Sequence, residues 1–596
     1  MLLRRFPFIV FLLVVACGRV VAAPAPTFDQ WVDTFTTEWA RTNPQFATQA
    51  QYFSGAEQDA LDRQLTMVGP WGNTFGRAAT EARAALARRG LEELKRIPTA
   101  NLTAAQRTSA ALVAWFLKNT IDSAEFAAHR AVFDQFAGLQ VGLVNFLTQT
   151  HPIRNRRDAE NYLVRLALVA PRIDEGIAEA RAAAAAGILS PRFIVERTLE
   201  QIDGFLLHPA RENVFTASFD TRMGALGAAI APEVRKSSVA AAEKIVAEAV
   251  IPAYRRVRAL LAEQLPKTTG DAGVWRLPRG AESYRQALAT YTTTSLGADE
   301  IHAIGLREVA RLEGEMDKIL RSLGYNEGSV KDRTAALEAA SQPPATPDPR
   351  AMLLADNERY VADALQRCEA LFDLRPRSPV VVKREPPFSE RTAAAHYTPP
   401  APDGSKPGTY WLPLPGPTFE LIRMRSLAYH EAVPGHHFQV ALQQESTELP
   451  RFRKLGAFGF ISAYGEGWGL YAERLADESG WYDGDPRGRL GALGMQLFRA
   501  RRLVVDTGMH AKRWTRQQAI DYGIPATEVE RYIVWPGQAC SYMIGQLRIV
   551  ELREKARSAL GGKFSIKGFH NVVLSTGSVP LDVLAQEVDA WVAAQR

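Results

Sequence analysis

Three of the chain's ten histidines lie within eight residues, in the segment H-E-A-V-P-G-H-H at positions 430–437. Without Pro434 and Gly435 the segment would read H-E-x-x-H, in which a helix presents two zinc-binding imidazoles and a catalytic carboxylate. Residues four apart on a helix lie one turn above each other and can share a metal ion. The residue four after His430 is Pro434, which has no ligand atom. The residue types therefore indicate metal chemistry, whereas their spacing does not fit an unbroken helix.

The second imidazole must be brought back toward the first. His436 follows His430 by about 9 Å along an unbroken helix, at ~1.5 Å per residue, too far for two ligands whose metal bonds are about 2 Å. We therefore predict a bulge or kink that returns His436 to the place of an i+4 ligand. His437 carries a larger excess and is predicted to support the site or contact substrate. The alternative is that Pro-Gly ends the helix and leaves the histidines in a turn without metal.

A third ligand is expected further along the chain, because zinc hydrolases keep three protein ligands and leave a fourth position to water or substrate. Glu466 lies between two glycines and precedes a bulky apolar segment. A buried carboxylate is costly unless it is paired or bound to metal, so Glu466 is the predicted third ligand. Glu473, two helical turns later, is predicted to orient an imidazole; the alternative is an ion pair with Arg474 on a solvated face.

Several segments together resemble a known bacterial family. HEAVPGHHFQ and YGEGWGLYAE are similar to the family catalogued as domain of unknown function 885, a branch of the gluzincin-type metallopeptidases. Weaker similarities lie at four further stretches: 300–306, 536–547, 569–570 and 577–581. The resemblance spans most of the chain after the leader. It implies zinc bound by His430, His436 and Glu466, with Glu431 as the general base.

The expected reaction is metal-assisted hydrolysis. Zinc would polarise water and the scissile carbonyl, and Glu431 would pass the water's proton to the leaving amine. Tyr542 and His570 are candidate donors to the oxyanion, and the alternative for each is a buried, hydrogen-bonded core residue. Substrate carboxylates have several candidate partners in the second half of the chain: Arg423, Arg425, Arg531 and Gln538.

We predict a zinc metallopeptidase that cleaves short or unfolded peptides, with exopeptidase action included. One alternative is a metal-dependent amidase or esterase acting on a non-peptide small molecule. The other is an exported binding lipoprotein in which the metal is structural. The sequence contains no G-x-S-x-G elbow, which disfavours lipase-like chemistry. The His, His, carboxylate ligand set favours zinc over other divalent metals.

The bulk properties exclude some partners. A net charge of +6 over 596 residues, without a dense basic run, is not the footprint of a nucleic-acid-binding protein. Residues 1–22 have the basic start and short apolar core of a signal peptide. Cys17 fits a lipobox and would then carry a lipid anchor, while Ala22 fits ordinary cleavage. Either route predicts an exported protein, periplasmic or lipid-anchored at the cell envelope.

The elements that must position the site are predicted to be mainly helical. Residues 27–290 form a helical N-terminal half and residues 291–596 a helical metallohydrolase half, with clear helices at 171–186 and 298–323. Eleven prolines between Pro376 and Pro417 exclude long helices there, and three short β-prone pieces remain: 380–383, 393–397 and 409–412. We predict a small sheet beside a thermolysin-like zinc-binding helix that carries the motif. Cys368 and Cys540 are expected to be buried apolar residues.

Overall fold

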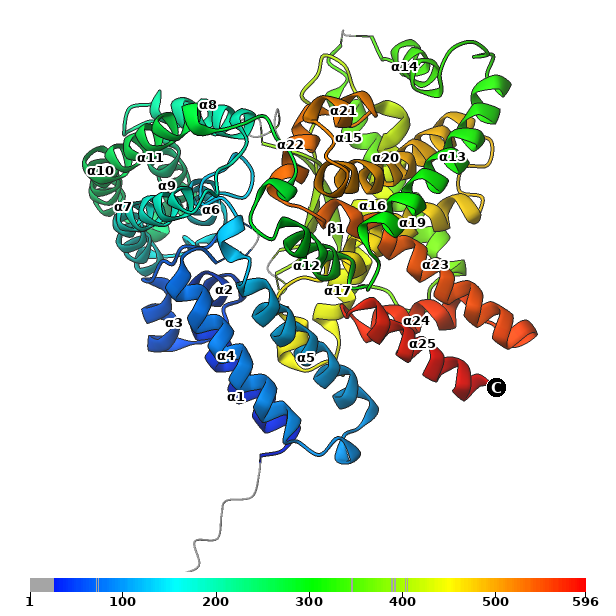
Figure 1. Ribbon diagram of the computed structural model, residues 1–596, viewed down its shortest axis with the longest axis horizontal. Coiled ribbons are helices and arrows are strands. Elements are labelled where there is room, and N and C mark those ends of the chain that lie inside the picture. Colours follow the sequence, from blue (N-terminus) through cyan, green and yellow to red (C-terminus); the bar gives the residue numbers. More distant parts are fainter. Residues whose placement is uncertain are drawn as a thin grey trace, which may run out of the picture.

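The computed structural model describes residues 26–596 apart from 71, 73, 345–346, 387–389, 391–392, 402–403 and 405. This part of the chain is mainly helical, as the sequence predicted (Figure 1). The leader and Cys17 lie outside the described residues. The helices of the first half are α1 (Phe28–Arg41), α2 (Pro44–Ala50), α3 (Gly55–Asp62), α4 (Arg77–Lys95), α5 (Ala104–Ala124), α6 (Leu139–Asn145), α7 (Arg156–Ala185), α8 (Arg192–Leu206), α9 (Val214–Gly224), α10 (Pro232–Ile245), α11 (Ile251–Gln264) and α12 (Gly280–Thr292).

The second half contains the sheet and the two helix pairs with the most extensive contacts. Its helices are α13 (Ala298–Ser322), α14 (Val330–Ala340), α15 (Arg350–Arg367), α16 (Met424–Glu431), α17 (His436–Glu445), α18 (Arg451–Lys454), α19 (Ser462–Glu478), α20 (Pro486–Ala511), α21 (Arg516–Asp521), α22 (Ala526–Val534), α23 (Ser541–Leu560), α24 (Ile566–Thr576) and α25 (Leu581–Gln595). Its strands are β1 (Val380–Arg384), β2 (His396–Thr398) and β3 (Gly408–Leu412).

The first half has a hydrophobic core of its own, in helices α6–α11. Figure 1 shows these helices gathered in one lobe. Aromatic pairs connect them: Tyr162 of α7 stacks on Phe219 of α9 with ring centroids 4.4 Å apart, and Phe205 of α8 stacks on Tyr254 of α11 at 3.9 Å. Offset stacking of this kind adds to the free energy gained from burying the rings.

Helix α1 packs instead against the second half. The aromatic side chains of this helix are buried, and Phe35 and Trp39 both contact the ring of Phe458, with centroids 6.2 and 5.3 Å apart. The hydrophobic cluster around these rings continues through α5, α19 and α23–α25. The division near residue 290 stays a prediction, because the packing joins the start of the chain to its last third.

The predicted small sheet is confirmed and has the strand order β1-β3-β2. Strand β3 pairs parallel to β1, with Val380 opposite Gly408, and antiparallel to β2, with Tyr397 opposite Tyr410. The sheet lies beside the motif, because the Tyr397 hydroxyl hydrogen-bonds Nδ1 of His437 at 2.9 Å. Both β1 and β2 are edge strands, which fits the proline-rich sequence around them.

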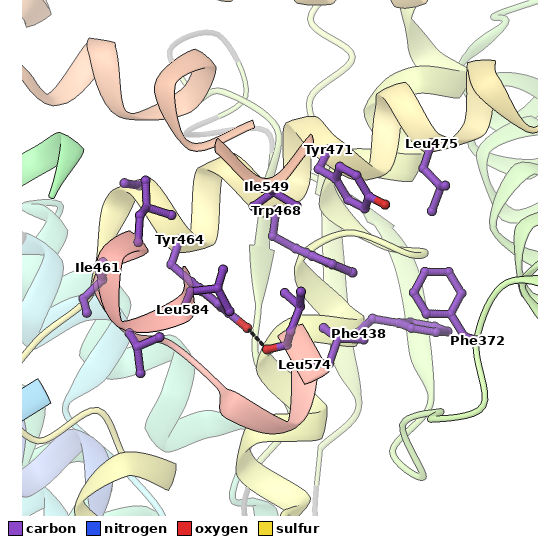
Figure 2. Packing of buried hydrophobic residues seen from close by; sticks show 14 of the residues in the cluster. Phe372, Phe438, Ile461, Tyr464, Trp468, Tyr471, Leu475, Ile549, Leu574 and Leu584 are labelled. Carbon is purple, nitrogen blue, oxygen red and sulfur yellow. Dashed lines mark hydrogen bonds between the residues drawn. The ribbon is translucent and has the colours of Figure 1, made fainter. Parts of the chain in front are cut away.

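Helix α19 has two distinct faces. Tyr464, Trp468, Tyr471 and Leu475 recur at helical spacing and point into the largest hydrophobic cluster (Figure 2). Tyr464 also donates a hydrogen bond to the carbonyl of Val573 at 2.7 Å. The other face carries Glu466 and Glu473. The helix therefore anchors itself in the core on one side and presents carboxylates on the other.

Helices α19 and α23 touch through glycines. A Cβ added to Gly545 would lie 2.0 Å from the carbonyl oxygen of Ala463, and one added to Gly467 would lie 2.6 Å from Cα of Gly545. Neither position has room for a side chain. The two backbones therefore meet directly, close to Glu466.

The observed ends of two helices can be compared with the predicted ones. The helix predicted at 298–323 is observed as α13, whereas the one predicted at 171–186 is the second half of α7, which starts at Arg156 and contains Pro171. Pro171 does not begin the helix. The apolar residues before it (Tyr162, Leu166 and Val169) are buried, and their packing stabilises a helix that continues past the proline.

Cys368 and Cys540 are free and buried, as expected. None of the helices in the described ranges combines the length and apolar composition needed to span a membrane.

Candidate metal centre

The motif spans two helices rather than one bulged helix. Helix α16 ends at Glu431 and α17 begins at His436, and the four residues between them form turns. Pro434 cannot continue the helix, because it lacks an N–H and its ring clashes with the preceding turn. Gly435 then folds back against α16 so closely that a Cβ would lie 1.8 Å from the carbonyl oxygen of His430. The predicted single helix with a bulge or kink is thus replaced by a complete break.

The break brings the two imidazoles together. The ring centroids of His430 and His436 lie 4.8 Å apart, with ring planes nearly perpendicular at 86°. Glu466 approaches both: its Oε2 lies 3.4 Å from Nε2 of His430 and 3.5 Å from Nε2 of His436. One ligand atom from each of the three residues falls within 4.8 Å of the others. The structure therefore brings together the three residues predicted as ligands, and their donor set is one that can hold a metal ion.

Glu473 fixes the orientation of His430. Its Oε1 lies 2.7 Å from Nδ1 of His430 and its Oε2 accepts a hydrogen bond from Ser426 at 2.8 Å. Glu473 is fully buried, so it does not form the exposed ion pair considered as its alternative. Gly469, between the two glutamates on α19, leaves room for the imidazole, since a Cβ there would lie 2.8 Å from the ring. The free nitrogen Nε2 of His430 is thereby directed toward Glu466.

The protonation of His430 and of Glu466 depends strongly on the charges beside them. Burial opposes protonation, but the hydrogen bonds to Glu466 and Glu473 raise the pKa of His430 to about 9. Although burial would raise it, the hydrogen bonds to His430 and His436 hold the pKa of Glu466 well below its ordinary value. Both shifts have the same origin, because carboxylates on either side of His430 stabilise positive charge there.

The charges of His430 and His436 also act on the carboxylate of Glu431. It is buried, and burial raises its pKa, while the charges of His430 and His436 oppose the rise. A carboxylate with a raised pKa is better suited to accept a proton near neutral pH. His396 of strand β2 also acts on the charge of Glu431, so the edge of the sheet borders this carboxylate.

We expect the Glu473→Gln variant to bind metal about 10- to 100-fold more weakly than the wild type. The substitution keeps the shape of the side chain but removes the negative charge behind His430. Competition with a chromogenic chelator measures the affinity. Asp477→Asn, on the same helix and paired with Arg489 at 2.8 Å, is the matched control for charge. Equal affinity of Glu473→Gln and wild type would contradict the role of Glu473 in orienting the ligand.

Three other predicted residues, Arg531, Gln538 and Tyr542, lie on α22, on α23 and on the short turn between them. Burial and the charge of Glu466 raise the pKa of Tyr542, and Arg502 and Arg531 lower it, so the phenol is close to the carboxylate. Gln538 is buried; it accepts a hydrogen bond from Nη1 of Arg531 at 2.8 Å. These predicted residues thus form one group next to the metal centre.

Other predicted residues lie elsewhere. His570 is in the core: its ring nitrogens hydrogen-bond the Tyr471 hydroxyl and the Leu371 carbonyl, each at 2.8 Å. Burial lowers the pKa of His570 to about 4. The expectation that His570 donates to an oxyanion is therefore not supported by its position; this neutral imidazole connects two elements of the core.

His437 and two arginines also have structural partners. Burial lowers the pKa of His437 to about 4, and the residue joins α17 to β2 through Tyr397. Arg423 pairs with Glu420 at 3.2 Å. Arg425 is bound by the Tyr429 hydroxyl and by Asp363 and Asp485. Neither arginine is joined to the metal centre.

The sequence analysis missed two arginines of helix α20. Arg499 Nη2 lies 4.0 Å from Oε1 of Glu473, and the guanidinium carbon of Arg502 lies 4.4 Å from the ring centroid of Tyr542. A signal was present: Arg499, Arg502 and Asp506 recur at helical spacing within a stretch that is apolar apart from Arg501. Charges on an apolar helical face are costly to bury and so indicate specific partners.

Comparison with known proteins gives a family and a fold. The family described as "Bacterial protein of unknown function (DUF885)" matches residues 64–588. No curated protein matches the chain. A crystal structure of a presumed lipoprotein from Colwellia psychrerythraea is 30% identical, with a TM-score of 0.86 over 95% of this chain and 100% of that one. A presumed lipoprotein of unknown function from Shewanella oneidensis is 19% identical, with a TM-score of 0.68 over 94% of this chain and 99% of that one, and shares the fold.

Proposed function

Because this chain belongs to the bacterial family DUF885, whose function is unknown, we propose an activity from its own side chains: metal-dependent hydrolysis of peptide bonds in short or unfolded peptides. The observation that carries this proposal is the convergence of His430, His436 and Glu466 beside Glu431. Structural zinc sites are closed by four protein ligands, whereas catalytic sites have three and keep one position open.

The residues present fit a divalent metal ion. Two imidazoles and one carboxylate match the preference of zinc for nitrogen and oxygen ligands. The orienting contact from Glu473 to the ring nitrogen that faces away from Glu466 is typical of metal-binding histidines. The side chains of His436 and Glu466 remain 14% and 17% exposed, so solvent and substrate reach this edge of the group. The metal ion would supply Lewis acidity toward water and the scissile carbonyl.

The protein's own residues then have distinct tasks. Glu431 accepts a proton from the attacking water as the new carbon–oxygen bond forms, and donates it to the amine nitrogen when the carbon–nitrogen bond breaks. The half-buried Tyr542 phenol, on which the charge of Glu466 acts, would donate a hydrogen bond to the carbonyl oxygen. Strand β2 is an edge strand near Glu431, where an extended peptide can add its backbone.

The test of this function uses the purified mature protein. We expect about one equivalent of zinc per chain, turnover in a library of quenched peptides, loss of turnover with a chelator, and recovery when zinc is added back. Parallel assays use small amides and esters. Turnover of these alone would favour the amidase or esterase alternative. A protein that unfolds on chelation and turns over nothing would favour a structural metal in a binding lipoprotein.

We also propose that the protein is exported and reaches the cell envelope. The structural neighbours described as presumed lipoproteins support this, as does the sequence of residues 1–22. The mass of the mature N-terminus distinguishes a lipid on Cys17 from cleavage after Ala22, and an unprocessed leader would contradict export.

A further inference from the structure

Three buried arginines lie beside the metal centre and are here called the arginine cluster: Arg499, Arg502 and Arg531. The first two are one turn apart on α20, and the third is on α22. Their exposed fractions are only 6%, 6% and 8%. A guanidinium out of contact with water is strongly destabilising unless acceptors surround it. The hydrogen-bond acceptors available to these three arginines therefore indicate the function of the arginine cluster.

The protein supplies fewer acceptors than the arginine cluster needs. Glu528 is shared: its Oε2 accepts from Nη2 of Arg502 at 3.0 Å and from Nη2 of Arg531 at 3.1 Å. Arg499 approaches Glu473 only at 4.0 Å, and that carboxylate is already bound by His430 and Ser426. One carboxylate thus balances two guanidinium groups, and the arginine cluster carries an excess of positive charge.

Arg502 has the largest unused hydrogen-bonding capacity. Its Nε and Nη1 atoms are buried and find no hydrogen-bond partner among the residues that the structure describes, and the same holds for Nε of Arg499 and of Arg531. Buried donors are normally satisfied, and a buried charged donor left without an acceptor costs more than a neutral one. Two unused donors on one guanidinium call for an anionic acceptor from outside the chain.

Arg502 lies near the proposed reaction centre, so an anionic acceptor that it binds would also lie near that centre. Its guanidinium carbon lies 4.4 Å from the ring centroid of Tyr542, and Tyr542 in turn lies within the field of Glu466. Arg502 thus contacts a side chain on which the charge of a predicted metal ligand acts. Arg499 provides a second link, because its Nη2 lies 4.0 Å from Oε1 of Glu473, the carboxylate that binds Nδ1 of His430.

We propose that the arginine cluster, with Arg502 as its main donor, binds a carboxylate of the substrate, and that this is the C-terminal carboxylate of a peptide. The inference rests on the proposed function and makes it narrower: the protein is a carboxypeptidase that removes residues from the C-terminal end. Guanidinium groups suit this task because they form strong, charge-assisted hydrogen bonds to carboxylates.

The test compares three forms of one N-acetylated peptide that the wild-type, zinc-loaded protein cleaves: the free acid, the C-terminal amide, and the amide with a glutamate next to the cleaved bond. We expect kcat/KM to fall about 10- to 100-fold from the acid to the plain amide. Equal rates for the acid and the amide would overturn the inference and leave the peptidase function intact. Recovery of the rate by the glutamate peptide would assign the arginine cluster to an acidic side chain and overturn the carboxypeptidase assignment. No turnover of any peptide would instead reject the proposed function.

Variants separate binding from a structural role. Arg502→Gln is expected to raise KM for the free acid about 10- to 100-fold and to affect the amide much less, so the preference for the acid disappears. Arg502→Lys keeps the charge and should retain part of the preference. Arg553→Gln is the matched control, because Arg553 is equally buried, pairs with Glu478 at 2.6 Å and faces the Tyr471 ring. Equal losses for acid and amide in Arg502→Gln would show a structural role only. If Arg502→Gln does not fold, the comparison of wild-type substrates still decides.

Discussion

Replacing Glu431 by Gln should lower kcat for peptide hydrolysis about 10²- to 10⁴-fold while the metal content stays at the wild-type value. The amide has nearly the shape of the carboxylate but cannot accept the proton of the attacking water. Glu431 is buried beside His430 and His436 and lies outside the group of three ligand atoms. Steady-state kinetics and elemental analysis of the same preparation measure both quantities.

An exposed carboxylate nearby serves as the control for Glu431. Glu420 pairs with Arg423 at 3.2 Å on the surface, and Glu420→Gln should keep wild-type kinetics. A Glu431→Gln protein that retains a tenth or more of the wild-type kcat would remove Glu431 from the role of general base. Loss of the metal together with turnover would place Glu431 among the ligands instead.

Replacing His436 by Ala should abolish turnover and weaken metal binding by more than about 100-fold, the upper range for a residue that only supports a ligand. With this imidazole removed, His430 and Glu466 are the two remaining protein ligands of the proposed site. Such a pair leaves half of a tetrahedral coordination sphere to water. Metal content after dialysis and turnover with added zinc are the measurements.

The next residue along the chain provides the comparison for His436→Ala. His437 is buried and hydrogen-bonded to Tyr397 at 2.9 Å, outside the three ligand atoms. His437→Ala should retain its metal through dialysis, with a smaller effect on stability and rate. If His437→Ala loses the metal and His436→Ala retains it, the assignment of the two histidines must be exchanged.

Much of this architecture could be predicted from the residues themselves. An apolar stripe at helical spacing predicted α13, and the prolines between 376 and 417 predicted where helices give way to short strands. The group His430, His436 and Glu466 followed from residue type and from the resemblance of two motifs. The break after Glu431 differed from the predicted bulge, because local sequence shows that Pro434 disturbs a helix without showing how the chain continues beyond it.

The parts that were missed depend on contacts between distant residues. Arg502 owes its position to Glu528 and Tyr542, which lie 26 and 40 positions further along the chain. The choice between the two roles considered for His570 depends on such contacts too: its partners, Tyr471 and the carbonyl of Leu371, come from other elements. Residue type reveals that a buried polar group needs a partner, but only the folded chain shows which one it has.

The glycine contact between α19 and α23 limits how the helices of the proposed reaction centre can move. With Gly467 and Gly545 in backbone contact, the helices that carry Glu466 and Tyr542 can neither approach further nor slide without a collision. Main-chain atoms therefore set the distance between the Glu466 carboxylate and the Tyr542 phenol. Thermal motion displaces main-chain atoms less than side-chain atoms. A single methyl group at Gly467 or Gly545 would push the two helices apart and increase the distance between the Glu466 carboxylate and the Tyr542 phenol.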